Sequence, residues 1–593
     1  MKTYHYLCII ILFFNSACNQ AEKKQNEKSD IENIDTLFEN YYNERMQLFP
    51  LEATSNGENQ YNDILPIDIA DSYRAKLKTF YEKYKDALAN YDREKLNASQ
   101  KMSYYILKRE MEMSIEGLQF HDNYMPINQF WSLPLTMGQL GSGSGNQPFK
   151  TVKDYDNFLG RINGFYAWCD TAIVYMQKGM ASGDVYPKIL VERIIPQMQP
   201  MMIDDVKKSV FYTPIKNIPK EFSEQDKNRL TAAYEKAIKE QVIPSYEKLY
   251  KFFKFEYMAK AKNTDGIADI PNGKERYEYL VRLWTTTNMT PDEVFELGQS
   301  EVKRIRAEME KIMAETGFKG DLKAFFKYVN TDKKFCPYKT PQEVIQAYNA
   351  IHTKMEPQLK KLFGVVPKSK FEVRETEKFR EASASAEYNP GAPDGSRPGI
   401  FYVPVSNAVK FNCLSMEDLF LHEAIPGHHY QCSLQAENTD LPKFRRFVWY
   451  GAYGEGWALY TESLGKELGL YTDPYQYFGS LSEEMHRAIR LVVDPAIHYK
   501  GWTREQAIQF SLENEAESEA DITTEIERYM AIPGQATAYK VGQLKIIELR
   551  KEAEKALGDK FSISKFHDEL LNDGCLPIDV LETKMRAWIA KQK

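Results

Sequence analysis

The chain has 593 residues, with 77 Lys and Arg against 84 Asp and Glu, and 43% of it is apolar. This composition excludes an intrinsically disordered chain, and the length excludes a disulfide-stabilised miniprotein. The net charge of −7 and the absence of a long Lys/Arg run argue against nucleic acid as a partner. At about 150 residues per domain, the length allows one to three domains.

The first 18 residues predict an export signal. Lys2 precedes an apolar run over residues 7–14, and Ser16-Ala17-Cys18 follows it; this is the order found in a bacterial lipoprotein signal peptide. Such a short run cannot span a bilayer. A buried N-terminal element is the alternative, but residues 19–32 offer almost no large apolar side chains to pack beside it. We therefore predict an exported lipoprotein of the cell envelope, in the periplasm or at the outer membrane, with lipidated Cys18 and a polar tether over residues 19–33.

Helical patterning dominates the rest of the chain. Apolar residues recur at three- and four-residue spacing from about Ile34 to Lys262 and again from Thr290 to about Leu362. The helical pattern resumes after Asn407, and no linker divides the chain beyond Thr290. We predict a mainly α protein in which a helical lobe over residues 34–289 packs as one unit with a catalytic region over residues 290–593.

Two short strands are expected inside the second region. Residues 371–376 alternate between apolar and polar, and residues 400–405 are rich in β-branched and aromatic side chains. Between them, residues 389–398 (NPGAPDGSRP) are turn material. Pro398 and Pro404 predict that the second strand lies at a sheet edge. Such an edge is either a covered structural hairpin, which composition favours, or a strand that pairs with an extended peptide substrate.

The segment HEAIPGHH, from His422 to His429, gathers three of the nine histidines around one glutamate. Ser415 and Asp418 resemble a capping box, which places residues 419–424 in a helix. His422 and Glu423 would then project from that helix, and Pro426-Gly427 should disturb it just before the histidine pair. Satisfied histidines beside a helix end are the alternative to a metal site.

The segment differs from the zinc motif H-E-x-x-H, because Pro426 occupies the position of the second histidine. On an ideal helix His429 lies roughly 20° from His422 but two turns away, whereas His428 lies about 120° away. A two-residue bulge at Pro426-Gly427 would make His428 the spatial equivalent of the missing ligand. We favour His428, with His429 as a supporting residue or the alternative ligand.

Catalytic zinc normally takes three protein ligands and leaves one position for water. The segment GEGWALYTE, from Gly454 to Glu462, offers the best third ligand. Glu455 lies between two glycines, which allow another helix to approach closely. Glu462 is the fallback ligand or the acceptor of a histidine N–H.

HEAIPGHH and GEGWALYTE together resemble the bacterial domain-of-unknown-function family 885, a group of candidate zinc-dependent peptidases often found as exported lipoproteins. The likeness extends over nearly the whole mature chain. It includes the segments DGSRPGIFYV (Asp394 to Val403), RLVVDPAIH (Arg490 to His498), GWTREQA (Gly501 to Ala507) and RYMAIPGQATAYKVG (Arg528 to Gly542). Pro495-Ala496 departs from the Thr-Gly expected of the family.

The resemblance implies a large helical zinc-metallopeptidase-like fold with a small β element near the active site. It further implies that His422, His428 and Glu455 bind Zn²⁺ and that Glu423 is the general base. This agrees with the chemistry of the residues, since zinc activates water and a neighbouring carboxylate can take its proton.

The oxyanion of amide hydrolysis needs a donor besides the metal. His498, Tyr529 and Tyr539 are the candidates, and Asp494, four residues before His498, could orient its ring. Arg397 and Arg528 could bind a substrate carboxylate. Tyr402, in the second expected strand, is a further candidate for substrate binding. Structural packing or ion pairing is the alternative role for each of these residues.

We predict a zinc peptidase that cleaves oligopeptides by direct attack of water. Covalent catalysis is not indicated, because no G-x-S-x-G elbow is present and no cysteine has an obvious base partner. The alternative is a non-catalytic helical surface lipoprotein that binds glycans or peptides. Contact with the membrane is expected only through the lipid anchor.

Overall fold

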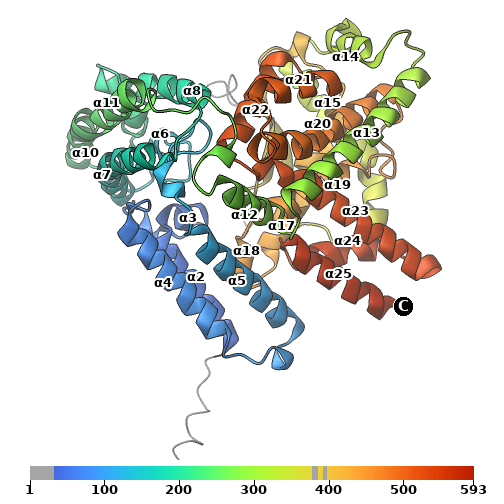
Figure 1. Cartoon of the computed structure of the whole chain (residues 1–593), viewed down its shortest axis with the longest axis horizontal. Coiled ribbons are helices and arrows are strands. Elements are labelled where there is room, and N and C mark those ends of the chain that lie inside the picture. Colours follow the sequence, from blue (N-terminus) through green and yellow to red (C-terminus); the bar gives the residue numbers. More distant parts are fainter. Residues whose placement is uncertain (1–32, 377–384, 392–396) are drawn as a thin grey trace, which may run out of the picture.

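The computed structural model describes residues 33–376, 385–391 and 397–593. The predicted signal peptide, Cys18, nearly all of the tether and Asp394 lie outside the described residues. The described chain is built almost entirely from helices around one small sheet (Figure 1), which confirms the mainly α fold. No described helix combines the length and apolar character needed to cross a membrane.

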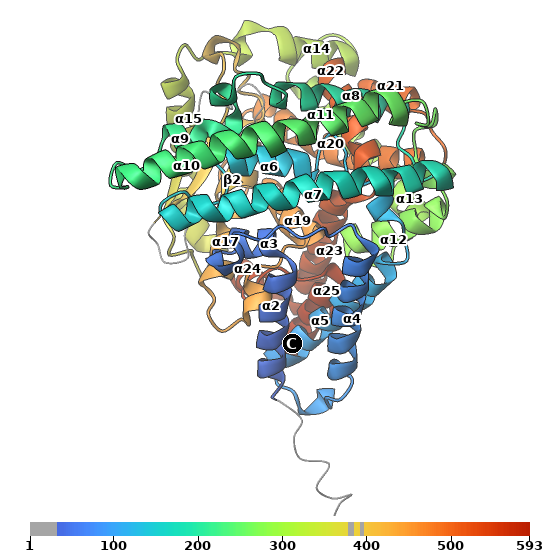
Figure 2. The ribbon, with the colours of Figure 1, turned by 90° about the vertical axis from the view of Figure 1, so that its left-hand side faces the viewer.

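The N-terminal helices form two groups. The first extends away from the rest of the molecule at the lower left of Figure 1. The second makes a layer in which α10 and α11 follow one another end to end and lie beside the long helix α7 in Figure 2. The first group comprises α2 (Ile34–Leu48), α3 (Pro50–Ser55), α4 (Asp71–Leu88) and α5 (Ala98–Gly117). The second comprises α6 (Leu133–Gly141), α7 (Val152–Ser182), α8 (Lys188–Met198), α9 (Thr213–Lys216), α10 (Glu224–Ala237) and α11 (Ile243–Phe252).

The remaining helices form the body at the right of Figure 1, where α13 packs along α20 and α19 along α23. Helices α12 to α15 precede the sheet: α12 (Gly273–Thr285), α13 (Pro291–Glu315), α14 (Leu322–Thr331) and α15 (Pro341–Leu362). After the sheet come α16 (Met416–Leu419), α17 (His428–Glu437), α18 (Lys443–Arg446), α19 (Gly451–Glu462), α20 (Pro474–His498), α21 (Arg504–Asn514), α22 (Glu519–Ala531), α23 (Ala538–Leu557), α24 (Ile563–Leu571) and α25 (Ile578–Gln592).

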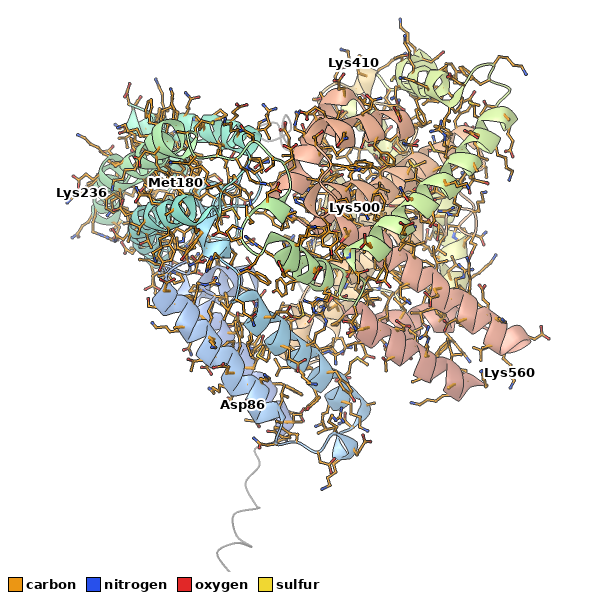
Figure 3. The ribbon with its side chains drawn as sticks, in the orientation of Figure 1. Asp86, Met180, Lys236, Lys410, Lys500 and Lys560 are labelled. Atoms are coloured by element: carbon orange, nitrogen blue, oxygen red, sulfur yellow. The ribbon has the colours of Figure 1, made fainter. Side chains whose placement is uncertain are left out.

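Two large apolar cores hold these groups together. One joins Trp168 of the α7 layer to Ile489 of α20 and Ile526 of α22. The other joins Tyr41 of the N-terminal group to Trp457 of α19. Side chains fill the space between the helices in Figure 3, while the labelled Asp86, Lys236 and Lys560 are exposed at the periphery. Each core therefore draws residues from both sides of position 290.

The sheet has three strands, β1 (Phe371–Glu375), β2 (Glu387–Asn389) and β3 (Gly399–Val403), in the order β1-β3-β2. β3 pairs parallel with β1 and antiparallel with β2. The prediction that β3 lies at an edge is wrong, because Pro398 and Pro404 flank the strand and neither interrupts its hydrogen bonding. β2 was not predicted, since its three residues border the turn segment.

The histidine segment folds differently from a simple bulge. Helix α16 continues into a π-helical turn, η12 (Phe420–Ala424), and α17 starts anew at His428. Ser415 precedes α16 as expected, but its side chain caps no backbone N–H. Asp418 is buried instead and accepts a hydrogen bond of 3.0 Å from Tyr471 Oη. The capping-box prediction is therefore wrong, although the predicted start of the helix is right.

Close contact between α19 and α23 depends on glycine. A Cβ atom on Gly542 would meet the carbonyl oxygen of Ala452, and one on Gly456 would lie 2.6 Å from the backbone of Gly542. Real Cβ atoms do not approach backbone atoms this closely, so any side chain here would separate the helices. Gly451 is a contrast on the same helix, since the nearest neighbour of a Cβ atom there would be Ala538 Cβ at 3.7 Å.

We expect Gly542→Ala to lower the free energy of unfolding by about 1–3 kcal/mol, because the added methyl group must push α23 away from α19. Chemical denaturation of the two proteins measures the difference. Gly451→Ala is the matched control and should change stability by less than about 1 kcal/mol. Equal effects of the two substitutions would contradict the glycine contact.

Candidate functional site

A cavity of about 630 Å³ lies between β2, the η12–α17 segment and helices α19, α20 and α22; we call it the cleft. Its lining is strongly charged. The carboxylates are Glu387, Glu423, Glu455, Glu483, Glu517, Asp521 and Glu525, and the arginines are Arg487, Arg490 and Arg528. β2 contributes Tyr388 as well, which confirms that the small β element borders this site.

Two imidazoles and one carboxylate converge in the cleft from three segments. Glu455 Oε2 of α19 lies 3.5 Å from His422 Nε2 of η12 and 3.6 Å from His428 Nε2, at the start of α17. The two rings are almost perpendicular, with centroids 4.9 Å apart. Ligands held tetrahedrally at 2.0–2.2 Å from one ion are about 3.3–3.6 Å from one another. The two distances from Glu455 Oε2 therefore match two edges of such a site.

The charged neighbours of His422 suit this part of the cleft to a cation. His422 Nδ1 lies 2.7 Å from Glu462 Oε1, which favours a proton on Nδ1 and leaves Nε2 directed at Glu455. Burial acts against the charged form of His422, but its hydrogen bonds to Glu455 and Glu462 outweigh this and raise its pKa. Glu455 and Glu462 thus stabilise a positive charge on His422, at the place where a bound metal ion would carry it.

The other two ligand candidates have suitable protonation states. Burial lowers the pKa of His428 to about 4, so this imidazole is neutral at neutral pH and keeps a lone pair for a metal. Burial would raise the pKa of Glu455, but the hydrogen bond from His422 and the nearby positive charges lower it to about 2. Glu455 is therefore an anionic ligand.

Glu423 borders the same point. One carboxylate oxygen of Glu423 and one nitrogen each of His422 and His428 all lie within 4.8 Å of one another. Burial, with a further contribution from Glu455, raises the pKa of Glu423 to about 7 against the effect of His422. Glu423 therefore lies beside the candidate ligands but is not part of the contact of Glu455 with His422 and His428.

His429 points elsewhere. Its Nδ1 lies 2.9 Å from Tyr388 Oη, and its ring packs against Phe371 with centroids 5.1 Å apart. It does not line the cleft. Of the two adjacent histidines, His428 is the one that joins His422 and Glu455.

Helix α19 also fixes the irregular segment that carries the histidines. Trp457 Nε1 donates to the carbonyl of Pro426 at 2.9 Å, and Thr461 Oγ1 donates to that of Leu421 at 2.8 Å. These side chains satisfy carbonyls left unpaired where η12 ends. The same helix therefore supplies Glu455, the acceptor Glu462 and the contacts that hold His422 and His428 in place.

The predicted oxyanion donor His498 is buried away from the cleft. Its Nε2 lies 2.9 Å from Tyr529 O, and its Nδ1 accepts from Ile267 N at 3.2 Å. Asp494 does not orient it, since Asp494 Oδ1 accepts from Tyr277 Oη at 2.5 Å and from Gly534 N at 2.9 Å. Both predictions are wrong, because backbone groups already occupy the two ring nitrogens.

The remaining predicted residues divide into two sets. Tyr539 and Arg528 line the cleft. Tyr529 does not; its hydroxyl accepts from Arg490 Nε at 3.0 Å and donates to Glu525 at 2.9 Å. Arg397 is exposed, and neither it nor Tyr402 of β3 lines the cleft. The side chains of Tyr529, Arg397 and Tyr402 are therefore not part of the lining of the cleft.

Sequence analysis missed a polar stripe on α20. Glu483, His486, Arg487 and Arg490 all line the cleft. They lie at positions i, i+3, i+4 and i+7, so they share one face of the helix. The signal was available, because Ala488, Ile489, Leu491 and Val492 fill the other faces with apolar side chains.

The sequence profile of a family described as bacterial protein of unknown function (DUF885) matches residues 50–585. A Colwellia psychrerythraea protein described as a candidate lipoprotein shares 26% identity with a TM-score of 0.86, covering 94% of this chain and 99% of its own. A Shewanella oneidensis protein described as a candidate lipoprotein of unknown function shares 20% identity with a TM-score of 0.73, covering 94% and 100%. No curated protein matches at a significant level.

A more distant match is the M32 carboxypeptidase from Deinococcus radiodurans R1, with 10% identity and a TM-score of 0.39 over 94% of this chain and 97% of its own. That score is too low to carry an argument about fold or activity. The Colwellia and Shewanella proteins have the fold described above.

The buried environment of His498 makes a prediction about acid stability. Burial lowers its pKa to about 3, whereas an unfolded histidine has a pKa near 6.5. Its contribution to stability is complete above pH 6.5 and is lost as the pH falls toward 3, because only the unfolded chain takes up the proton. This histidine makes the unfolding free energy fall by up to about 1.4 kcal/mol for each pH unit below pH 6. We expect His498→Gln to remove this contribution, so that the unfolding free energy falls less steeply with decreasing pH.

Urea unfolding at pH 6.5, 5.5 and 4.5 measures this slope. An unchanged slope in His498→Gln would show that the imidazole is not held neutral.

Proposed function

The chain belongs to the bacterial family of unknown function DUF885, and from the geometry of its own cleft we propose that it is a zinc-dependent hydrolase that cleaves peptide bonds in oligopeptides. The observation that carries this proposal is the approach of Glu455 Oε2 to the Nε2 atoms of both His422 and His428, at 3.5 and 3.6 Å. Glu423 is a further carboxylate beside this group, with an oxygen within 4.8 Å of one nitrogen of each histidine.

The donor set suits zinc better than other common ions. Two imidazoles and one carboxylate are a usual set for catalytic zinc, while Mg²⁺ and Ca²⁺ prefer ligands that are all oxygen. His428 is neutral and Glu455 is charged, as ligands must be, and Glu462 holds the ring of His422 in orientation. When bound, zinc supplies the Lewis acidity that makes water a nucleophile near neutral pH.

Glu423 is placed to move the proton. It follows His422 in the same turn and presents an oxygen within 4.8 Å of the imidazole nitrogens, inside the cleft. We assign it as the general base that takes a proton from the attacking water and delivers it to the departing amine. Tyr539 and Arg528 are the cleft residues that remain as candidate donors to the developing oxyanion.

The shape of the cleft supports a peptide as substrate. β2 pairs with β3 on one side, and within the described residues no strand pairs with its other side. Glu387 and Tyr388 of β2 line the cleft, so an extended peptide added to β2 would pass the histidines. A volume of about 630 Å³ lies within the range typical of small-ligand sites.

We further propose that the protein is an exported lipoprotein anchored to the cell envelope through Cys18, with no other contact with the membrane. The support is the order of residues in the N-terminal segment, and the description of the Colwellia and Shewanella proteins as candidate lipoproteins.

Two substitutions separate metal binding from chemistry. We expect Glu423→Gln to retain one zinc per chain and to lose peptide hydrolysis by at least about 100-fold, because a general base contributes 10²–10⁴-fold. We expect Glu455→Gln to lose both, since an amide cannot supply the anionic ligand. Elemental analysis after dialysis gives the metal content, and mass spectrometry of a peptide library gives the products.

His429→Gln is the matched control, because His429 adjoins His428 yet faces Tyr388; its zinc content should equal that of the unsubstituted chain. Normal hydrolysis by Glu423→Gln would refute the base, and stoichiometric zinc in Glu455→Gln would refute the ligand set. Absence of zinc from the unsubstituted protein would favour a binding lipoprotein without catalysis.

A further inference from the structure

We propose that Arg487 and Arg490 bind a carboxylate of the substrate, so that the cleft selects peptides with an anionic group near the bond that is cut. This inference rests on the proposed function and specifies the substrate class. It concerns a part of the cleft formed by α20, apart from the residues that would hold the metal.

Both arginines share the cleft with the candidate metal group. They lie three positions apart on the polar face of α20, and both line the same cavity as His422, His428 and Glu455. The cavity of about 630 Å³ is small enough that a peptide beside the histidines also reaches α20. An anion held here would therefore lie close to the scissile bond.

Arg490 is held in place with one nitrogen left unpaired. Its Nε donates to Tyr529 Oη at 3.0 Å, and its Nη2 donates to Glu525 Oε2 at 3.0 Å and lies 3.1 Å from His486 Nε2. The guanidinium also packs over the ring of Tyr539, 4.8 Å from its centroid. Among the described residues, Nη1 has no hydrogen-bond partner. A guanidinium held in this way can donate from Nη1 to one oxygen of a carboxylate.

Arg487 has more unused donors. Its Nη1 pairs with Glu483, while its Nε is buried and has no partner among the described residues. Nη2 likewise has none among them. The side chain is only 15% exposed, and a buried guanidinium with unpaired N–H groups is costly. An anion in the cleft would satisfy the donors that face it.

The other charged residues of the cleft also affect whether a substrate carboxylate binds there. Glu483 and Glu525 are paired with the arginines, whereas Glu517 and Asp521, which also line the cleft, form no ion pair with an arginine among the described residues. With seven carboxylates against three arginines the lining has an excess of acidic groups, so a carboxylate can bind only where it meets unpaired guanidinium N–H groups. Among the described residues, Arg487 and Arg490 offer such groups in the cleft.

The carboxylate can come from the C-terminus of a peptide or from an acidic side chain. Three probes separate these sources: acetyl-trialanine with a free acid, its C-terminal amide, and the C-terminal amide of a peptide in which glutamate replaces the last alanine. Their affinities are measured by calorimetric titration of zinc-loaded Glu423→Gln protein, which binds substrate without consuming it.

We expect the free acid to bind at least about tenfold more tightly than the neutral amide, as a charge-assisted contact of about 1.4 kcal/mol requires. Adding Arg487→Gln should abolish this preference. Arg487→Lys keeps the ion pair with Glu483 and should retain part of it. Arg93→Gln, at an exposed arginine outside the cleft, should leave it unchanged.

Tight binding of the glutamyl amide would identify a side-chain carboxylate as the source, and tight binding of the free acid alone would identify the C-terminus and removal of terminal residues. Equal affinity for all three probes, or no measurable binding of any of them, overturns the inference. The inference is also overturned if the Arg487→Gln variant keeps the preference for the anionic probe. If that variant does not fold, an undiminished preference in the Arg487→Lys variant overturns it instead. Zinc content and hydrolysis by the unsubstituted protein test the proposed function separately.

Discussion

The placement of one carboxylate between two imidazoles is the constraint on which the site depends. Glu455 is charged and only partly exposed, so its charge must be compensated within a few ångströms. The compensation comes from His422, whose pKa is raised, while the neutral imidazole of His428 lies on the other side of the carboxylate. The two histidines belong to different helical segments, η12 and α17, so any change that moves α19 relative to η12 separates the carboxylate from His422.

Several contacts of α19 serve this constraint. Glycines on α19 and α23 let the two helix backbones meet, so α19 lies deep enough for Glu455 to reach the histidines. Trp457 and Thr461 bind the carbonyls at the end of η12, and Glu462 fixes the ring of His422. A single helix thus links the apolar core, through Trp457, to the chemistry of the cleft.

How much could be predicted from the sequence depended on whether the signal was local. The spacing of apolar residues identified the helices, and the clustering of histidines and glutamates singled out His422, His428 and Glu455 as candidate ligands. Pro426-Gly427 predicted an interruption of the helix before the histidine pair, but the π-helical turn could not be foreseen, because a contact from Thr461 of α19 stabilises it. His498 was misassigned, since sequence does not show that the backbone of Ile267 and Tyr529 occupies both ring nitrogens. The strand β2 is too short to leave a pattern.

X-ray absorption at the zinc edge of the purified protein tests the central claim most directly. Ligation by His422, His428 and Glu455 predicts two imidazole nitrogens and oxygen at about 2.0–2.2 Å, with four-coordinate geometry. A sulfur ligand near 2.3 Å, which Cys432 in the same cleft could supply, or a shell of six oxygens without imidazole would contradict it.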